Sequence, residues 1–286
     1  MRIDLHTHSR VSDGTDTPGD LVRAASAAGL DVVAITDHDT TDGWAEALRV
    51  GEQEGIRVAP GIEISTRYGD AGVHLLAYLP DPGHAGLQAE LSRIRAGRVD
   101  RVPAMLARLR ELGIPATEEG LAEVSAGASA TGRPHVADLM VRLGVVADRD
   151  EAFAGYLAEG RPAYVDRYAA ELAGCVALVV AAGGVPVIAH PWGRGSERAL
   201  DADALAHLAR AGVRGIEVDH LDHDADQRAR LRGIAGEVGL LVTGSSDHHG
   251  TGKTGHDLGC ETTAAPVWEQ IQELAVRAGS PMVDRR

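Results

Sequence analysis

The sequence predicts an α/β fold, a seven-stranded barrel that carries an inserted helical subdomain. Short apolar strands alternate with amphipathic helices over most of the 286 residues, which is typical of a parallel sheet or barrel. From about residue 83 to residue 160 the pattern is helical and indicates no strand. The chain has one Phe and few other aromatic residues, so Val, Leu, Ile and Ala must fill a core that suits parallel strands covered by helices.

Each predicted element follows from local sequence signals. The stretch PGDLVRAASAAG at 18–29 begins with Pro and ends with Gly, the residues preferred at the start and end of a helix. Before the interruption we expect strands at 2–6, 31–36, 57–64 and 73–79 and helices at 18–29 and 42–55. After it we expect helices at 168–182, 201–211, 224–238 and 266–278 and strands at 185–189, 214–219 and 240–244. Residues 1–82 and 161–286 then form the barrel, and residues 83–160 form the insertion, which covers the active site.

Charge and composition restrict the class of protein. A net charge of −14 argues against a general affinity for long nucleic acid, although bound divalent ions would reverse the local field. The two cysteines give neither a disulfide framework nor a paired-cysteine zinc motif. The N-terminus lacks the features of a signal peptide, and no apolar run is long enough for a membrane span. We therefore expect a cytoplasmic protein without membrane association, and nothing indicates an obligate protein partner.

The stretch IDLHTHSRVSDG places two histidines at the end of the first predicted strand. Side chains two residues apart in a strand project to the same face, so His6 and His8 can share one metal ion. Asp13 follows closely and offers a carboxylate. A polar loop with unused histidines explains this motif equally well when it is considered alone.

Similar residues follow the other strands, and in α/β barrels the strand ends and the loops after them build the active site. Singly, each has a structural explanation: Asp13 could serve an Asp-Gly turn, Asp37 could cap a helix and His74 could be a core histidine. Their joint placement favours one site for more than one ion, and nitrogen and carboxylate ligands suit zinc, manganese or iron. The candidates are His6, His8, Asp13, Asp37, His38, Glu63, His74, His190, Asp247 and His249.

The motifs DLHTHSRVSDG, ITDHDT, PGIEIS, HLLAY, AHP and GSSDHH, in this order and at these separations, resemble the polymerase and histidinol phosphatase (PHP) superfamily. Within it, the chain is most similar to the bacterial nucleoside 3',5'-bisphosphate phosphatases and the 5'-to-3' exoribonuclease of the same subgroup. The resemblance runs from residue 1 to about residue 260 and includes the insertion. It implies a distorted seven-stranded barrel with three divalent metal ions (Mn, Fe or Zn).

The resemblance also implies how the ligands divide among the ions. His6, His8, Glu63 and Asp247 would hold the first ion. Asp13, His38 and His249 would hold the second, and Glu63, His74 and His190 the third. Asp37 would instead orient a neighbouring ligand, and Ser9 and Ser246 could act similarly.

Clustered divalent ions acidify a water molecule and neutralise phosphoryl charge, so this centre would hydrolyse a phosphate ester in line without a covalent enzyme intermediate. We expect His135 and Asp247 to be catalytic residues. An imidazole can protonate the leaving group, and the candidates for this general acid are His135 and His248.

A group of arginines in the insertion could bind the substrate. The stretch RIRAGRVDRVPAMLARLR at 93–110 carries six arginines and one aspartate. It could be a solvated helix face, but guanidinium groups also suit phosphate. By the resemblance, Arg98, Arg101, Arg133 and His135 are the substrate-binding residues. The insertion would then supply the site for a second phosphate.

Other polar residues remain outside this site. The stretch GTGKTG at 250–255 fails the phosphate-binding P-loop pattern, because the first glycine would fall at Asp247. We expect Lys253 to lie in a mobile loop. We expect His84, His207, His223 and His256 at the surface, and leave Glu217 and His220 unassigned although they follow a strand.

The expected function is hydrolysis of small phosphorylated nucleotides, namely removal of the 3'-phosphate of a nucleoside 3',5'-bisphosphate such as pAp, with activity on AMP also possible. An exoribonuclease acting on short RNA from its 5' end is the first alternative, because it needs the same metals. It also needs a longer basic groove, so the modest arginine cluster and the net negative charge rank it after the expected function. Histidinol phosphatase is the second, and a non-catalytic PHP scaffold is the third.

Overall fold

The barrel wall consists of seven strands in the order β1-β2-β3-β4-β6-β7-β8. The computed structural model describes residues 1–126 and 128–283. The strands are β1 (Ile3–Asp4), β2 (Val32–Ile35), β3 (Arg57–Tyr68), β4 (Ala71–Tyr78), β6 (Val185–Ala189), β7 (Gly215–Asp219) and β8 (Leu241–Gly244). A two-residue strand, β5 (Ala170–Glu171), pairs with β3 beside this path. The predicted seven-stranded α/β barrel is therefore confirmed.

The two ends of this strand path meet just beyond β1 and β8. Thr7 and His248 form an isolated parallel bridge, and the backbone N–H of His8 donates to the carbonyl of His248 at 2.8 Å. The N–H of Thr263 donates to the carbonyl of Ile3, also at 2.8 Å. The barrel is thus nearly closed, and its seam joins two segments that carry predicted metal ligands.

Strand β4 runs antiparallel to both of its neighbours, so the expectation of a parallel wall does not hold there. Strand β3 continues to Tyr68, past its predicted end at residue 64, and a turn at Gly69 (φ +59°) returns the chain directly into β4. A parallel connection needs a crossover of about a dozen residues, whereas antiparallel strands need only a tight turn. The stretch between the two strands is too short for a crossover.

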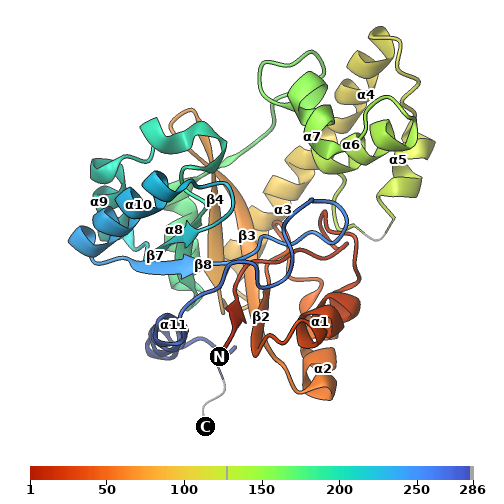
Figure 1. The fold of residues 1–286 in the computed structure, drawn as a ribbon. Coiled ribbons are helices and arrows are strands. Elements are labelled where there is room, and N and C mark those ends of the chain that lie inside the picture. The colour runs from red at the N-terminus through yellow and green to blue at the C-terminus, as the bar shows by residue number, and fades with distance from the viewer. Residues whose placement is uncertain (127, 284–286) are drawn as a thin grey trace.

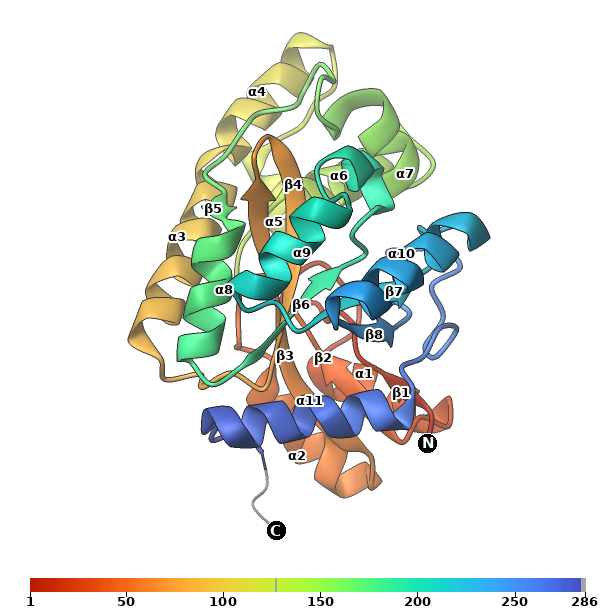
Figure 2. The same cartoon turned by 90° about the vertical axis from the view of Figure 1, so that its left-hand side faces the viewer.

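Helices cover the outside of the barrel, and α11 crosses the end opposite the insertion (Figures 1 and 2). The side chain of Thr17 caps α1, Asp224 and Gln227 form a capping box at α10, and Gly55 ends α2 with φ +71°. The helices are α1 (Pro18–Ala27), α2 (Trp44–Glu54), α8 (Leu172–Ala181), α9 (Ala202–Ala211), α10 (Ala225–Val238) and α11 (Ala265–Ala278). Helix α8 starts later than the predicted residue 168 because β5 occupies the preceding positions.

The segment between β4 and β5 forms a second, helical lobe (Figures 1 and 2). Its helices are α3 (Ala85–Asp100), α4 (Val102–Glu111), α5 (Glu118–Val124), α6 (Arg133–Arg142) and α7 (Arg149–Ala152), followed by a π-helix at Phe153–Leu157. Helix α3 packs on the barrel core through Leu87, Leu91 and Ile94, whereas α4 and α6 share a separate apolar cluster. The division at residues 82/83 and 160/161 stays a prediction, and residues 127 and 284–286 of the predicted ranges lie outside the described residues.

No helix within residues 1–126 and 128–283 combines the length and apolar character that a transmembrane span requires.

The separate core of the insertion makes a stability prediction. Leu106 on α4 is fully buried in this cluster, so Leu106→Ala should lower the free energy of unfolding by about 2–5 kcal/mol through lost contacts and a residual cavity. Leu112 at the end of the same helix is 47% exposed, and Leu112→Ala should change it by less than about 0.5 kcal/mol. Urea titrations followed by circular dichroism would measure both. Equal losses in the two variants would contradict a distinct packed core.

Candidate metal centre

The structure brings all nine predicted metal ligands together at one end of the barrel, where the parallel strands end and the antiparallel strand β4 begins. His6 and His8 follow β1, His190 follows β6, and Asp247 follows β8. A nitrogen or oxygen of each of the nine lies within 3.7 Å of another member of the set. The barrel therefore places imidazoles and carboxylates in one buried cluster. Both groups are common ligands of transition metals.

Four of these residues have the spacing that a single ion requires. The Nε2 atoms of His6 and His8 are 3.0 Å apart, and both lie 3.2–3.3 Å from Oε2 of Glu63. Both also lie 3.3–3.4 Å from Oδ1 of Asp247. Ligands about 2.0–2.2 Å from a common ion lie about 2.8–3.6 Å apart in octahedral or tetrahedral geometry. This quartet consequently fits the first predicted ion.

Glu63 has the position of a bridging carboxylate. Its Oε2 faces His6, His8 and, at 3.1 Å, Nδ1 of His38. Its Oε1 faces the opposite set, with Nδ1 of His74 at 2.6 Å and Nε2 of His190 at 3.1 Å. The two oxygens can therefore serve two ions, as the third predicted ligand set requires.

The remaining predicted set is centred on Asp13. Its carboxylate lies 3.7 Å from Nε2 of His38 and 3.5 Å from Nε2 of His249. Nδ1 of His8 is also 3.7 Å away, and these four residues form one of the groups whose donor atoms could surround an ion. The spacing is wider than in the quartet but compatible with a second ion.

The carboxylates of the cluster are held in their ionised form. Burial alone would favour the neutral acids, but neighbouring imidazoles keep the pKa values of Asp13 and Glu63 well below their ordinary range. For Asp247, the ammonium of Lys253 and the ring of His6 oppose burial and lower the pKa in the same way. The carboxylates in turn outweigh burial and raise the pKa values of His6 and His8, the latter to about 9, so the cluster favours positive charge among its carboxylates, which metal cations can also supply.

Two members of the cluster adopt an unusual backbone conformation. His190 has φ +26° and Asp247 has φ +52°, a region that non-glycine residues avoid at a cost of about 1–3 kcal/mol. Such residues concentrate at functional sites, where the surrounding structure fixes them. Here each directs its side chain toward the cluster.

Asp37 organises the loop that carries Asp13. Its carboxylate accepts hydrogen bonds from the N–H and Oγ of Ser9 and from Oγ of Ser12, all at 2.7–2.8 Å. Oγ of Ser12 in turn lies 3.2 Å from Oδ1 of Asp13 and 3.4 Å from Nδ1 of His8. This arrangement agrees with the positioning role predicted for Asp37, and Ser12 is a member that the sequence did not reveal.

Glu217 and His220, which the sequence left unassigned, support the cluster from behind. Glu217 is fully buried, with Oε1 3.2 Å from Nδ1 of His6 and Oε2 accepting from the N–H of His190 at 2.9 Å. Nδ1 of His220 accepts from the N–H of Asp222, so its Nε2 carries the hydrogen toward Oδ2 of Asp247 at 3.3 Å. Glu217 lies within β7 and His220 directly follows it, and this place at a strand end, like that of the predicted ligands, was the available signal.

Two surface expectations are wrong. His223 and His256 are buried, at 3% and 7% exposure, and donate to the carbonyls of Val218 and Ser246. Lys253 lies in a loop as expected, its mobility stays a prediction, and its Nζ lies 2.6 Å from Oδ2 of Asp247 in the ligand cluster. The chain folds back after β8 and brings these residues inward, which local sequence patterns do not reveal.

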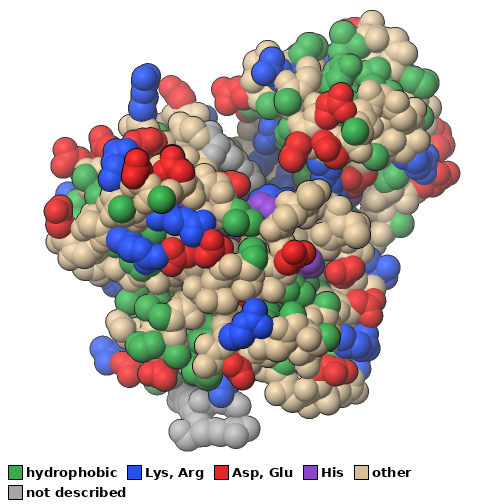
Figure 3. Space-filling model, viewed as in Figure 1, with side chains coloured by type: hydrophobic (Ala, Val, Ile, Leu, Met, Phe, Trp, Pro, Cys, Tyr) green, Lys and Arg blue, Asp and Glu red, His purple; other side chains and the backbone are tan. Residues whose placement is uncertain are grey.

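The insertion faces the cluster across a small hollow between the two lobes (Figure 3). Asp13 and His38 line it from the barrel, and Arg98 and His135 line it from the insertion. The Nε of Arg98 donates to Asp39 at 2.8 Å and its Nη2 to Oγ of Ser65 at 2.5 Å. Arg98 is therefore fixed at the junction of the lobes.

The other predicted substrate arginines, Arg101 and Arg133, lie in a basic cluster with Arg98 and Arg167. Arg101 is 6% exposed, and burial together with Arg133, Arg167 and Arg98 lowers its pKa to about 8. Its Nε has no hydrogen-bond partner in the part of the chain that the structure describes. Arg167, not identified from the sequence, has its pKa lowered to about 10 by burial and by Arg98.

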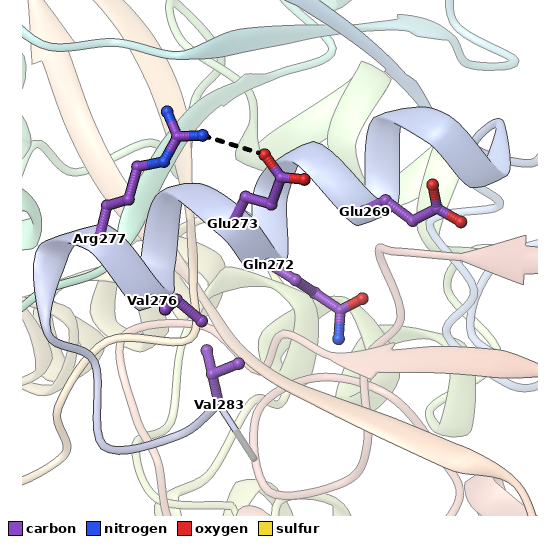
Figure 4. Close-up of a pocket in the computed structure, with 6 residues that line it drawn as sticks. All are labelled: Glu269, Gln272, Glu273, Val276, Arg277 and Val283. Carbon is purple, nitrogen blue, oxygen red and sulfur yellow. Dashed lines mark hydrogen bonds and ion pairs between the residues drawn. The ribbon is translucent and has the colours of Figure 1, made fainter. Parts of the chain in front are cut away.

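A second hollow lies at the outer surface of α11, far from this chemistry. It is lined by Glu269, Gln272, Glu273, Val276, Arg277 and Val283 (Figure 4). An ion pair of 3.2 Å joins Glu273 to Arg277 in it. The helix crosses the opposite end of the barrel from the insertion, so this hollow has no part in the site (Figures 1 and 2).

The bridging position of Glu63 makes a prediction about metal content. Glu63→Gln keeps the size of the side chain but removes its charge and one oxygen ligand, so the purified variant should hold fewer ions per chain than the parent. Glu123→Gln, at a side chain that is 68% exposed, should hold the parent's number. Elemental analysis by plasma mass spectrometry measures both. An unchanged metal content in the Glu63 variant would contradict the bridging role.

The burial of His135 makes a prediction about pH. Burial lowers the pKa of His135 below 6.5, against the opposing charges of Asp13 and Asp138. As the pH falls below about 6.5, the unfolded chain binds a proton here and the folded chain does not, so stability is lost. His135→Gln keeps an acceptor for the N–H of Gly132, which donates to Nδ1 at 3.1 Å, but does not titrate. From about pH 7 to about pH 5.5 it should lose less unfolding free energy than the parent in urea titrations. Identical pH slopes would refute this.

Comparison with known proteins agrees with the geometry. The PHP domain model matches residues 4–117. A 3',5'-nucleoside bisphosphate phosphatase of Chromobacterium violaceum is 35% identical over 96% of this chain and 98% of its own length. A 5'-3' exoribonuclease of Haemophilus influenzae is 33% identical over 94% of this chain and 99% of its own length.

A solved structure gives the same result. A protein of Bifidobacterium adolescentis, proposed to be a metal-dependent phosphoesterase, superimposes with a TM-score of 0.90 at 36% identity, over 95% of this chain and 96% of that one. Strand order, buried ligand cluster and relatives all agree. The chain therefore belongs to the PHP family and is a metal-dependent phosphoesterase.

Proposed function

We propose that this enzyme removes the 3'-phosphate from nucleoside 3',5'-bisphosphates and also acts on AMP. Three divalent ions would occupy the cluster of His6, His8, Asp13, His38, Glu63, His74, His190, Asp247 and His249. The relative from Chromobacterium violaceum, named for this substrate class, supports the proposal.

The basic cluster of the insertion is the observation that carries the proposal. Arg98 lines the hollow beside Asp13 and His38, and burial together with the neighbouring arginines lowers the pKa values of Arg101 and Arg167. Asp39 forms an ion pair with this group through Arg98. Guanidinium groups gathered beside the hollow favour an anionic ligand, and the cluster of predicted metal ligands would already account for one phosphate. A ligand with two phosphates matches both.

Different residues of the chain would have different roles in hydrolysis. Divalent ions, when bound, would supply an acidified water molecule and neutralise charge on the phosphoryl oxygens. Glu63 and Asp247 would hold those ions at a fixed separation, and Glu217 would fix the ring of His6 through its Nδ1. The insertion would exclude bulk water from the hollow, which strengthens these interactions.

His135 has the geometry of a hydrogen-bond donor to the phosphoryl group. Its Nδ1 accepts from the N–H of Gly132, so in the neutral ring Nε2 carries the hydrogen. Burial favours this neutral form. We propose that Nε2 donates to a phosphoryl oxygen and that a dianionic substrate raises the pKa of the ring, which allows it to protonate the leaving oxygen.

Short RNA is the main alternative substrate, and the exoribonuclease relative favours it. A longer strand would need a basic groove that continues beyond the hollow. The basic cluster instead lies between the lobes, in a chain with a net charge of −14. Histidinol phosphate has only one phosphate and leaves this cluster unused.

A substrate panel tests the proposed function. The metal-loaded enzyme should hydrolyse pAp with a higher kcat/KM than AMP, histidinol phosphate or short 5'-phosphorylated RNA, because pAp alone can engage both anion sites compactly. Release of phosphate and of mononucleotides would be followed separately. A higher kcat/KM on RNA than on pAp would replace the proposal with the exoribonuclease function.

The second-phosphate site makes a matched mutational prediction. Arg101→Met removes a buried guanidinium, and charge-assisted hydrogen bonds contribute about 1.5–3 kcal/mol, so kcat/KM for pAp should fall about 10- to 150-fold. On p-nitrophenyl phosphate, which has one phosphate, the change should stay below about threefold. Arg142→Met, at a side chain that is 43% exposed, should behave like the parent. Equal losses on both substrates would contradict a second-phosphate site at Arg101.

A further inference from the structure

We infer that Lys253 is a substrate-contacting residue of this active site, and that its ammonium group binds a phosphoryl oxygen of the substrate while it also contacts Asp247. This inference rests on the proposed role of Asp247 as a metal ligand. It concerns the phosphoryl group that reacts, and so does not depend on which nucleotide carries that group.

Lys253 is unusual among the basic residues of the chain. The sequence contains 28 of them, and Lys253 is its only lysine, the others all being arginine. The two side chains are not equivalent, because an ammonium is a compact charge with three donor hydrogens, whereas a guanidinium is a larger planar fork. The one place where this chain uses an ammonium is beside its metal cluster.

The contact with Asp247 places that ammonium next to the reacting centre. Nζ lies 2.6 Å from Oδ2 of Asp247, and Oδ1 of the same carboxylate belongs to the quartet with His6 and His8. His220 already orients Oδ2 from the buried side, and its side chain is fully buried. Lys253 is 25% exposed, so a side chain that solvent reaches contacts this buried carboxylate. Its position therefore suits a second, substrate-facing contact.

The loop that carries Lys253 is held in place between the two lobes. The N–H of Thr251 donates to Oγ1 of Thr15 at 3.0 Å, and Gly250 has φ +64°. Gly252 packs against the guanidinium of Arg149, so closely that a Cβ atom would lie 2.6 Å from Nη1. Arg149 belongs to the insertion and also donates to the carbonyl of Asp13 at 2.8 Å. Lys253 thus stands at the mouth of the barrel on a fixed support.

An ammonium at this position can bridge a carboxylate and an oxyanion. Hydrogen bonds between charged groups are short and about twice as strong as neutral ones. The tetrahedral ammonium can direct one N–H to Asp247 and another to a phosphoryl oxygen beside the ion held by His6 and His8. The planar fork of an arginine would span a greater width at the same point.

The single lysine permits a direct spectroscopic test. Zinc-loaded protein grown with lysine labelled with ¹³C at Cε should give one side-chain resonance, and inorganic phosphate should shift it with the dissociation constant measured by calorimetry. A resonance that stays fixed while calorimetry detects phosphate binding would overturn the inference. Absence of phosphate binding by the metal-loaded enzyme, together with absence of turnover, would instead refute the proposed function.

Variants of Lys253 distinguish a contact with the substrate from a purely structural role in positioning Asp247. Lys253→Met should weaken inorganic phosphate binding and lower kcat/KM on p-nitrophenyl phosphate about 10- to 100-fold, with the parent's number of ions per chain. Lys253→Arg should recover only part of this loss. Thr254→Ala, at an exposed position in the same loop, should match the parent. Loss of ions in Lys253→Met, or phosphate affinity equal to the parent's, would overturn the contact.

Discussion

One buried carboxylate, that of Glu63, controls the arrangement at the mouth of the barrel. Its two oxygens face the rings of His6, His8, His38, His74 and His190 at 2.6–3.3 Å. A buried charge is costly without compensation, and imidazoles alone compensate it only when they take up protons. Divalent cations shared with the same imidazoles satisfy the carboxylate and the rings together. The antiparallel pairing of β3 with β4 makes this possible, because it places Glu63 and His74 on adjacent strands.

Around this carboxylate the fold supplies a second layer that fixes each ligand. Glu217 contacts His6 and His190, and His220 contacts Asp247, all from the buried side. Such outer partners set the tautomer and orientation of ligating groups and so tune the affinity for metal. The insertion closes the other side, where Arg149 joins α7 to the Asp13 loop. Ligand geometry, access of water and substrate contacts are thus coupled through a few buried side chains.

Much of this site could be predicted from the sequence because its ligands follow apolar runs. The strands that precede His8 and Asp247 could be predicted from their apolar runs. Parallel strands bring their carboxyl ends to one end of the barrel. Strand β4 runs antiparallel because its connection to β3 is short. The alternation of predicted strands and helices does not indicate this direction. His256 and Lys253 resemble surface residues locally, and only the return of the chain after β8 buries one and brings the other to Asp247. The burial of His256 and the contact of Lys253 therefore depend on tertiary structure, which the local sequence pattern does not show.

Anomalous X-ray diffraction from crystals of manganese-loaded protein would show whether the cluster binds the ions. We expect three anomalous peaks inside the cluster, with one beside His6 and His8, one beside Asp13 and His249, and one beside His74 and His190. The carboxylate of Glu63 should lie between the first and the third. Peaks outside the cluster, or a cluster without any peak in crystals that contain manganese, would contradict it.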